Sequence, residues 1–405
     1  MTEHPQDGLT SENLAALASL LDQHATGLGR ITPRPRGSRL SPEVWDLVDE
    51  AVTAVNRSLQ GSPVDSLGVA GSLVYGNGCY AVGRHSDAAQ VYSAVLEQEP
   101  SNADARFNLG LAYLRLKSPD DAVREFTDLL DREPHLPEAY YQRGNGHDDL
   151  GQVDRALDDY GRAIELDPGY VQAMYNRGVV LGQAGRHQEA VAQFDKVNAI
   201  RPDISNAHLN RGASLDELGL HDEAVSSYTK AAELNPENAH ALFNRARTNY
   251  YLGKLHESAD DYTRVIELTP DDAEAFNNRG LAYDALGDYE TAVEDFNSAL
   301  ELRPSFAEAH SNRGAVLEVL GDLDEALKEY KYSLEADPNL ASAHYNAARV
   351  YSRNGDVASS LVHLDRVFEI APQLAEDATH DVHLGWVLKL REMREVREPE
   401  QESGN

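Results

Sequence analysis

The sequence predicts an all-α fold, a solenoid of short helix hairpins stacked one upon the next. Three observations predict it. Small residues and prolines each recur with a constant spacing of 34 residues along most of the chain. Within each period, small and aromatic residues lie three and four positions apart, which places them on one face of a helix. A short break divides each period into two such halves, so each period predicts a pair of antiparallel helices.

The period is clearest between Ala273 and Pro304, AEAFNNRGLAYDALGDYETAVEDFNSALELRP. The helical stripes consist of Phe276, Gly280 and Tyr283 in the first half and of Ala292, Phe296 and Ala299 in the second. Gly287 suits the left-handed conformation that ends a helix, and Asp288 suits the cap of the next helix. Pro304 follows the second half, where a helix could not continue through it.

The same pattern recurs nine times, from Val69 to about Leu374. Its small residues are Gly76, Gly110, Gly144, Gly178, Gly212, Ala246, Gly280, Gly314 and Ala348. Its prolines are Pro100, Pro134, Pro168, Pro202, Pro236, Pro270, Pro304, Pro338 and Pro372. The predicted repeats occupy residues 63–374 and start near residues 69, 103, 137, 171, 205, 239, 273, 307 and 341. Positions within a repeat are counted from these starts.

In its period and its small–aromatic–small pattern the chain resembles the tetratricopeptide repeat family. The resemblance covers about three quarters of the sequence. It implies a right-handed superhelix whose first helices line a concave surface. One hairpin cannot bury its apolar faces alone, so each repeat must pack on the next. We expect Gly280 and Ala292 where the two helix backbones approach closely, with Tyr283 and Phe296 filling the space beside them.

The first 62 residues do not fit the repeat pattern and predict an N-terminal cap. Residues 11–25 and a segment that starts at Ser41 have helical apolar patterns, and Pro42 suits a first helical position. Between them, residues 27–39 are rich in glycine, proline and arginine and predict a linker with local positive charge. Two alternatives stay open: the linker is a docking arm, or the 62 residues form a module that binds something else.

Residues 375–397 predict a C-terminal capping helix, and residues 398–405 predict a disordered tail. Within the repeats, Lys117 replaces the glycine expected at the turn of the second repeat. The single cysteine, Cys79, occupies an aromatic packing position and is expected to be a buried small hydrophobe. An intramolecular disulfide is therefore excluded.

The chain carries a formal net charge of −32 and has a pI near 4.7. Such a charge repels phosphates and anionic membrane surfaces, which argues against nucleic acid and membrane as partners. It favours a basic partner, although a charged surface also keeps an elongated protein soluble, and both explanations stay open. We expect no signal peptide and no membrane span, hence the cytoplasm, and the excess of arginine over lysine suggests a bacterial source.

Positions two, five, six, nine, twelve and thirteen of each repeat follow the stripe opposite the packing face and are expected to line a groove. Position six holds an amide in eight successive repeats: Asn108, Gln142, Asn176, Asn210, Asn244, Asn278, Asn312 and Asn346. An amide can pair with both groups of a peptide backbone. The pattern resembles the asparagine ladder in the repeat domain of O-GlcNAc transferase, which implies a grip on extended chains. Local hydrogen bonding between helices is the alternative explanation.

Positions twelve and thirteen give the predicted groove an acidic character with one aromatic region. The acidic residues are Asp148, Asp149, Asp216, Glu217, Asp284 and Glu318, and the aromatic region consists of Tyr250 and Tyr251 with Arg247 nearby. These residues predict binding of a basic, partly apolar extended peptide. The alternative is an ordinary solvated helix face. No lysine occupies position five, so the lysine-based carboxylate clamp of chaperone-binding relatives is excluded.

No motif for phosphate binding, nucleotide binding or nucleophilic catalysis is present, so we predict no catalytic residue and no cofactor. His147 precedes two aspartates but occupies an aromatic packing position, so it is expected in the core rather than at a metal. The sequence therefore favours a non-catalytic scaffold that binds a peptide segment of another protein. Two alternatives stay open: an accessory subunit that presents a substrate to a separate enzyme or regulates it, and a scaffold that assembles with copies of itself.

Overall fold

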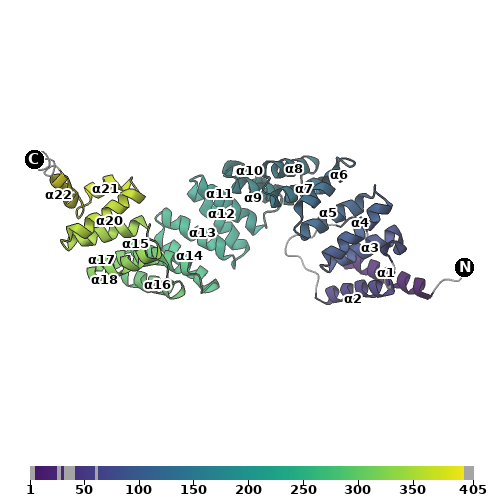
Figure 1. The fold of residues 1–405 in the computed structure, drawn as a ribbon, viewed down its shortest axis with the longest axis horizontal. Helices are drawn as coiled ribbons and strands as arrows, with labels where there is room; N and C mark the ends of the chain where they lie inside the picture. Colours follow the sequence, from purple (N-terminus) through teal and green to yellow (C-terminus); the bar gives the residue numbers. More distant parts are fainter. Residues whose placement is uncertain (1–4, 25–28, 32–41, 60–62, 396–405) are drawn as a thin grey trace, which may run out of the picture. The chain divides into compact units, whose positions relative to one another are not determined.

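The computed structural model describes residues 5–24, 29–31, 42–59 and 63–395, and all regular structure in this part of the chain is helical (Figure 1). The all-α prediction is thus confirmed. The chain divides into two units, Met1–Pro202 and Asp203–Asn405. The predicted linker, apart from Gly29–Ile31, and the predicted C-terminal tail lie outside the described residues.

Unit 1 begins with two helices that pack on one another and on α3. A single 3₁₀ turn, η1, precedes α3. The elements of unit 1 are α1 (Pro5–His24), α2 (Pro42–Leu59), η1 (Val64–Leu67), α3 (Gly68–Ala81), α4 (His85–Gln98), α5 (Ala103–Arg115), α6 (Pro119–Leu130), α7 (Pro137–Asp149), α8 (Val153–Leu166), α9 (Val171–Gln183) and α10 (His187–Ile200).

Unit 2 consists of five similar hairpins followed by two short helices. Its elements are α11 (Ser205–Glu217), α12 (His221–Leu234), α13 (Ala239–Tyr251), α14 (Leu255–Leu268), α15 (Ala273–Leu286), α16 (Tyr289–Leu302), α17 (Ala307–Leu320), α18 (Leu323–Ala336), α19 (Ala341–Arg353), α20 (Val357–Ile370), α21 (Leu374–His380) and α22 (Gly385–Glu395). Within each unit, a helix packs most extensively on its hairpin partner, and the second helix of each hairpin packs on the first helix of the next (Figure 1).

The turn between α15 and α16 shows how local sequence sets a hairpin. Gly287 has φ of 82°, in the left-handed region that glycine adopts without a steric penalty. The Asp288 carboxylate accepts a hydrogen bond from the Thr291 main-chain nitrogen at 3.3 Å and so caps α16. Both features are confirmed as the sequence predicts them. The same turn in the second repeat holds Lys117 with φ of 59°, the one non-glycine residue with positive φ in the described part of the chain.

The seven glycines among the small residues of the first helices make room for a ring rather than for a backbone. A Cβ atom added at Gly280 would lie 2.8 Å from the Phe296 ring, and one at Gly314 would lie 2.7 Å from the Tyr330 ring. This corrects the expectation of a close approach between the Gly280 and Ala292 backbones. The aromatic side chain of the second helix instead reaches across to the first helix, where only a glycine or alanine leaves space.

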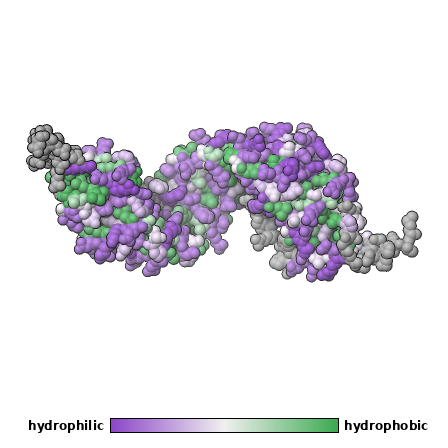
Figure 2. Space-filling model, viewed as in Figure 1, coloured by the Kyte–Doolittle hydropathy of each residue, from purple (hydrophilic) through white to green (hydrophobic). Residues whose placement is uncertain are grey.

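Arginines at repeat position seven join neighbouring hairpins, a role that the sequence analysis missed. Arg143 donates to both Asp159 oxygens, at 2.8 and 2.7 Å, and to Thr127 Oγ1 of the preceding hairpin at 3.3 Å. Arg245 repeats this arrangement with Asp261, and Arg279 repeats it with Asp295. Part of the negative charge of the sequence is therefore neutralised inside the hairpins. Figure 2 shows that hydrophilic residues predominate on the visible face of each unit, with hydrophobic residues in small separate patches.

Candidate functional site

Two asparagines on neighbouring first helices form one amide surface in unit 1. Asn77 lies on α3 and Asn108 lies on α5, and both side chains are fully buried. Asn108 Nδ2 donates to Asn77 Oδ1 at 3.0 Å, and the Tyr92 hydroxyl donates to the same oxygen at 2.8 Å. These bonds fix the orientation of both amides, so Asn108 Oδ1 is left to accept from another group.

That group belongs to the chain itself. The Ile31 main-chain nitrogen donates to Asn108 Oδ1 at 2.8 Å. The Gly29 carbonyl oxygen accepts from Asn77 Nδ2 at 2.9 Å and from Asn108 Nδ2 at 3.0 Å. The Ile31 side chain is only 1% exposed. Asn108 thus pairs with a donor and an acceptor of one main chain, which is the contact that the amide ladder predicts for a bound peptide.

The side chain of Arg30 is recognised by charge. Its guanidinium lies 3.1 Å from Asp104 Oδ1 and 3.2 Å from Glu133 Oε2. It also lies over the Phe107 ring, 5.4 Å from the ring centroid. Asp104 and Phe107 occupy positions two and five of their repeat, which the sequence assigns to the groove.

We call the five residues that hold this segment the Gly29–Ile31 subsite. They come from α3, α5 and the turn after α6, and they contact the main chain or the arginine of the segment. They are Asn77, Asp104, Phe107, Asn108 and Glu133. The subsite therefore combines an amide grip on the backbone with an acidic and aromatic pocket for one cation.

A second amide pair lies two repeats further along unit 1. Asn176 Nδ2 donates to Asn145 Oδ1 at 2.9 Å, and the Tyr160 hydroxyl donates to the same oxygen at 2.9 Å. This pair uses its other donors within the chain, from Asn145 to Gln142 Oε1 at 3.0 Å and from Asn176 to the Tyr141 hydroxyl at 3.2 Å. Asn108 therefore bonds to the main chain of a segment outside the repeats, whereas Asn176 bonds to neighbouring helices.

The ladder in unit 2 is half-buried along its length. Asn312 Nδ2 donates to Asn277 Oδ1 at 2.9 Å, and Asn278 Oδ1 accepts from Asn277 Nδ2 at 3.2 Å. The remaining predicted amides of this unit are Asn210, Asn244 and Asn346. All of them lie on first helices, at the position where Asn108 contacts the Gly29–Ile31 segment in unit 1.

The predicted acidic residues differ widely in their surroundings. Asp148, Asp149 and Glu217 are exposed at the ends of first helices. Glu318 is only 5% exposed, and Arg349 and Arg353 neutralise it within the chain. Glu318 is therefore not a free carboxylate to which a cation of a partner could bind.

The aromatic region lies on α13. The Tyr250 and Tyr251 rings are 6.2 Å apart, and Tyr251 is 70% exposed. Burial raises the pKa of Tyr250, and the charge of Asp284 raises it further. Arg247 is exposed on the same helix. Asp284 itself is half-buried, and burial raises the pKa of its carboxyl group.

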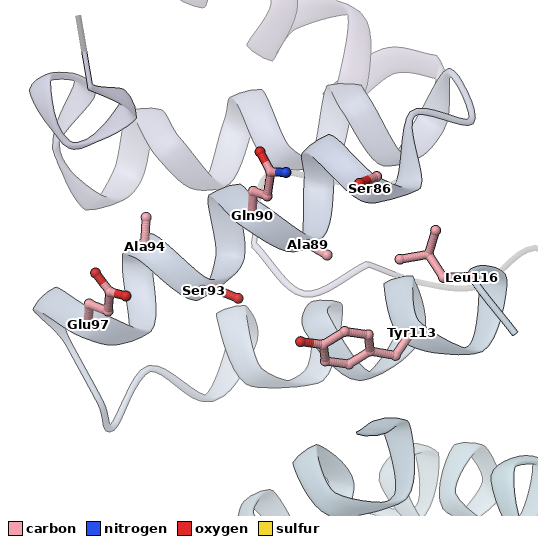
Figure 3. Close-up of a pocket in the computed structure, with 8 residues that line it drawn as sticks. All are labelled: Ser86, Ala89, Gln90, Ser93, Ala94, Glu97, Tyr113 and Leu116. Carbon is pink, nitrogen blue, oxygen red and sulfur yellow. The ribbon is translucent and has the colours of Figure 1, made fainter. Parts of the chain in front are cut away.

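A shallow hollow of about 400 Å³ opens between α4 and α5, away from the groove positions (Figure 3). Figure 3 shows Ala89 and Ser93 directed toward Tyr113, whereas Gln90 and Ala94 point to the other side of α4. No residue of the predicted site lines this hollow. Its lining mixes polar side chains with Ala89, Ala94, Tyr113 and Leu116, and it is open to solvent, so it does not resemble an enclosed ligand pocket.

His147 is buried beside Gln152, with its Nδ1 2.9 Å from Gln152 Oε1, as the core prediction requires. Within the described ranges, no three histidines, cysteines or acids converge as a metal site would need. Cys79 is fully buried, and burial raises the pKa of its thiol to about 12. Of the helices that the structure describes, none is both long enough and apolar enough to cross a bilayer.

The fold and this surface define an α-solenoid of helix hairpins, a class that uses its repeated first helices to contact other polypeptides. Matches described as Tetratricopeptide repeat cover residues 77–137, 141–203, 205–238, 273–306 and 307–328, and matches described as TPR repeat cover residues 246–287 and 319–355. The chain belongs to the tetratricopeptide repeat family, as the sequence predicts, and is a protein–protein interaction scaffold.

One solved structure of the family supports a similar fold, and two others match part of the chain. The C-terminal part of a TPR repeat-containing protein from Cytophaga hutchinsonii is 18% identical with a TM-score of 0.52, and the match covers 59% of this chain and 98% of that one. YrrB, described as a TPR protein with an unusual peptide-binding site, is 26% identical over 45% of this chain and 95% of its own, with a TM-score of 0.43. MamA from Desulfovibrio magneticus RS-1 is 25% identical over 42% of this chain and 96% of its own, with a TM-score of 0.41. Comparison with curated proteins gave no match.

Proposed function

We propose that this protein is a non-catalytic scaffold that binds an extended, arginine-containing segment of another protein on the surface of its first helices. The bound segment is held by amides at position six through its main chain and by acidic and aromatic residues through its cations. The amide contact tolerates many sequences because every residue has the same backbone groups. The arginine contact adds selectivity for a basic segment.

The observation that carries the proposal is the contact between Asn108 and the main chain of Gly29 and Ile31. It supports the amide grip because an amide of the ladder bonds to the main chain of a segment from outside the repeats. The position of Arg30 between Asp104 and Glu133 supports the preference for a cation. The amide at position six recurs along the repeats, so a partner's segment can use it elsewhere on the surface, whereas the pair of Asp104 and Glu133 belongs to this subsite.

The test uses a fluorescent peptide that copies residues 27–39, GLGRITPRPRGSR, and a variant chain whose own segment is weakened by Arg30→Ser and Ile31→Ser. A tethered segment competes with a free peptide at a high effective concentration. We therefore expect the peptide to bind the weakened variant at least about ten-fold tighter than the native chain in fluorescence anisotropy. Asn108→Ala added to the weakened variant should abolish this gain.

Two controls separate specific from general attraction. A peptide with citrulline in place of Arg30 keeps the shape of the side chain but lacks its charge, and it should bind more weakly. Affinity should also fall steeply between about 20 and 200 mM salt, because mobile ions screen exposed charges. The proposal fails if the peptide does not bind the weakened variant, or if Asn108→Ala leaves its affinity unchanged.

A further inference from the structure

Three carboxylates of unit 2 occupy position twelve of their repeats: Asp216, Asp284 and Glu318. Glu318 shows how the chain's own side chains can neutralise such a carboxylate. Glu318 Oε1 lies 3.1 Å from Arg349 and 3.0 Å from Arg353, which are positions nine and thirteen of the next repeat. The Tyr330 hydroxyl of α18 donates to its other oxygen at 3.3 Å. Two cations and one hydroxyl thus compensate for the burial of this charge.

Asp216 is the second of these carboxylates, and hydroxyl groups satisfy it. The Tyr228 hydroxyl of α12 donates to Asp216 Oδ2 at 2.9 Å. The Thr248 hydroxyl, at position ten of the next repeat, donates to the same oxygen at 2.7 Å. His221 Nδ1 lies 3.1 Å from the other oxygen. The repeat geometry therefore brings five positions to a position-twelve carboxylate: the second-helix ring and the position of His221 in the same repeat, and positions nine, ten and thirteen of the next repeat.

Asp284 is the third carboxylate, and four of these five positions hold a side chain that cannot pair with it, while Tyr289 at the position of His221 makes no hydrogen bond to it in the described structure. The four residues that cannot pair are Phe296, Ala315, Val316 and Val319. Phe296 lacks the hydroxyl of Tyr228 and Tyr330, and Val316 lacks that of Thr248. Among the described residues, the Asp284 carboxylate has neither a hydrogen bond nor an ion pair.

The surroundings of Asp284 suit a side chain that arrives from another molecule. Val319 occupies the place from which Arg353 reaches Glu318, and it is 61% exposed. Tyr250 lies close enough for the charge of Asp284 to raise its pKa, and the exposed Tyr251 ring adjoins it. A half-buried carboxylate beside exposed apolar and aromatic groups matches a cation flanked by apolar residues.

We propose that Asp284 binds an arginine of the partner's extended segment, in place of the arginines that Glu318 obtains from its own chain. This inference rests on the proposed function, and it identifies arginine as the partner side chain that binds to unit 2. Arginine is favoured over lysine because its planar group pairs with a carboxylate and stacks on a tyrosine at the same time. Arg30 makes the same two kinds of contact with Asp104 and Phe107 in unit 1.

The probe is a fluorescent nonapeptide, Gly-Ser-Gly-Ile-Arg-Ile-Gly-Ser-Gly, compared with the same peptide carrying citrulline for arginine. We expect the native chain to bind the arginine peptide more tightly in fluorescence anisotropy. Asp284→Asn should weaken that binding about ten-fold and remove the preference over citrulline. Asp271→Asn is the matched control, since it removes one charge from an exposed turn near the same hairpin and should change nothing.

A second variant supplies the missing arginine within the chain. Val319→Arg places a guanidinium near Asp284, in the position that Arg353 has relative to Glu318. The variant should therefore have a higher melting temperature and a lower pKa of Asp284 in an NMR titration, and it should no longer bind the arginine peptide. The inference is overturned if the native chain binds both peptides equally, if Asp284→Asn has no effect, or if Val319→Arg leaves the pKa of Asp284 unchanged. Any of these results leaves the proposed function standing as long as the 27–39 peptide still binds at the Gly29–Ile31 subsite through Asn108.

Discussion

Asn108 donates a side-chain hydrogen bond to Asn77 across 3.0 Å, and this bond fixes the direction in which the Asn108 side-chain oxygen accepts. Because the Asn108 nitrogen is directed toward Asn77, its oxygen faces the Ile31 main-chain N–H. The bond between Asn176 and Asn145 repeats this relationship after two hairpins. An amide pair that spans two first helices is therefore a recurring element of the fold.

The first prediction concerns the contact of Asn108 with its own chain. Asn108→Ala removes the acceptor for the Ile31 N–H and one of the two donors to Gly29, so the segment should leave the surface more often. Amide hydrogen exchange at Ile31 should become at least about ten-fold faster, which corresponds to a loss of one net hydrogen bond. Asn346→Ala is the control, because it removes a ladder amide from unit 2. Unchanged exchange at Ile31 would show that Asn108 does not hold the segment.

The second prediction compares two glycines of one hairpin. A Cβ atom at Gly144 would lie 2.8 Å from the Tyr160 ring, so Gly144→Ala should lower the free energy of unfolding by about 1–3 kcal/mol. Gly161 lies within α8, and a Cβ atom there would approach only Arg177 Nε, at 3.9 Å. Gly161→Ala should therefore stabilise the protein by about 0.4–1 kcal/mol, because alanine restricts the unfolded chain. Denaturant titration distinguishes the two signs, and equal effects would contradict the packing role of Gly144.

The third prediction exchanges two residues at equivalent turns. Lys117 has φ of 59°, which costs a residue with a side chain about 1–2 kcal/mol, whereas Gly151 occupies the same turn of the next repeat with φ of 68°. Lys117→Gly should raise the stability by about 0.5–1 kcal/mol, since the flexibility of glycine in the unfolded chain offsets part of the gain. Gly151→Lys should lower the stability by a similar amount. Melting temperatures that move in the same direction for both variants would refute the argument.

The fold could be predicted from the sequence because its determinants are local and repeated. The positive φ of Gly287 and the cap made by Asp288 each depend on one residue at a turn. A hairpin that cannot bury its own faces must repeat its pattern, and the repeated pattern is visible in the sequence. The partner of Gly280 was misassigned because helical spacing shows which residues share a face but not which ring crosses to the opposite helix.

The candidate site could be predicted only in part. The ladder position of Asn108 follows from the 34-residue spacing, but its contact with Ile31 joins residues 77 positions apart in the chain. The segment around Arg30 has no periodicity that would indicate where it packs. Its positive charge alone led to the alternative prediction that it is a docking arm. The ion pair between Glu318 and Arg353 could have been predicted from the sequence. Arg353 occupies position thirteen of the repeat that follows Glu318, and a comparison of this position between repeats shows the arginine.

The fourth prediction concerns pH and the hairpin of α19 and α20. His344 Nε2 donates to the Pro338 carbonyl oxygen at 3.1 Å, so its Nδ1 accepts from His363 Nδ1 at 2.9 Å. Burial and, to a smaller extent, the charge of His344 together lower the pKa of His363 to about 4. An unfolded histidine has a pKa of about 6.5, so the folded hairpin binds fewer protons than the unfolded one between these values. Its stability is full above about pH 6.5 and is lost as the pH falls toward 4.

Native-state hydrogen exchange measures this effect as the free energy of opening of α19 and α20, which should fall by on the order of 2 kcal/mol between about pH 7 and pH 4.5. The preceding hairpin supplies the control, because there His310 Nδ1 lies 2.8 Å from Glu329 Oε2, and a carboxylate favours a charged histidine. His363→Glu copies that pair and removes the histidine whose pKa is lowered, so its hairpin should lose less stability over the same interval. If the native and variant hairpins lose stability equally on acidification, the buried histidine pair is not the group that titrates.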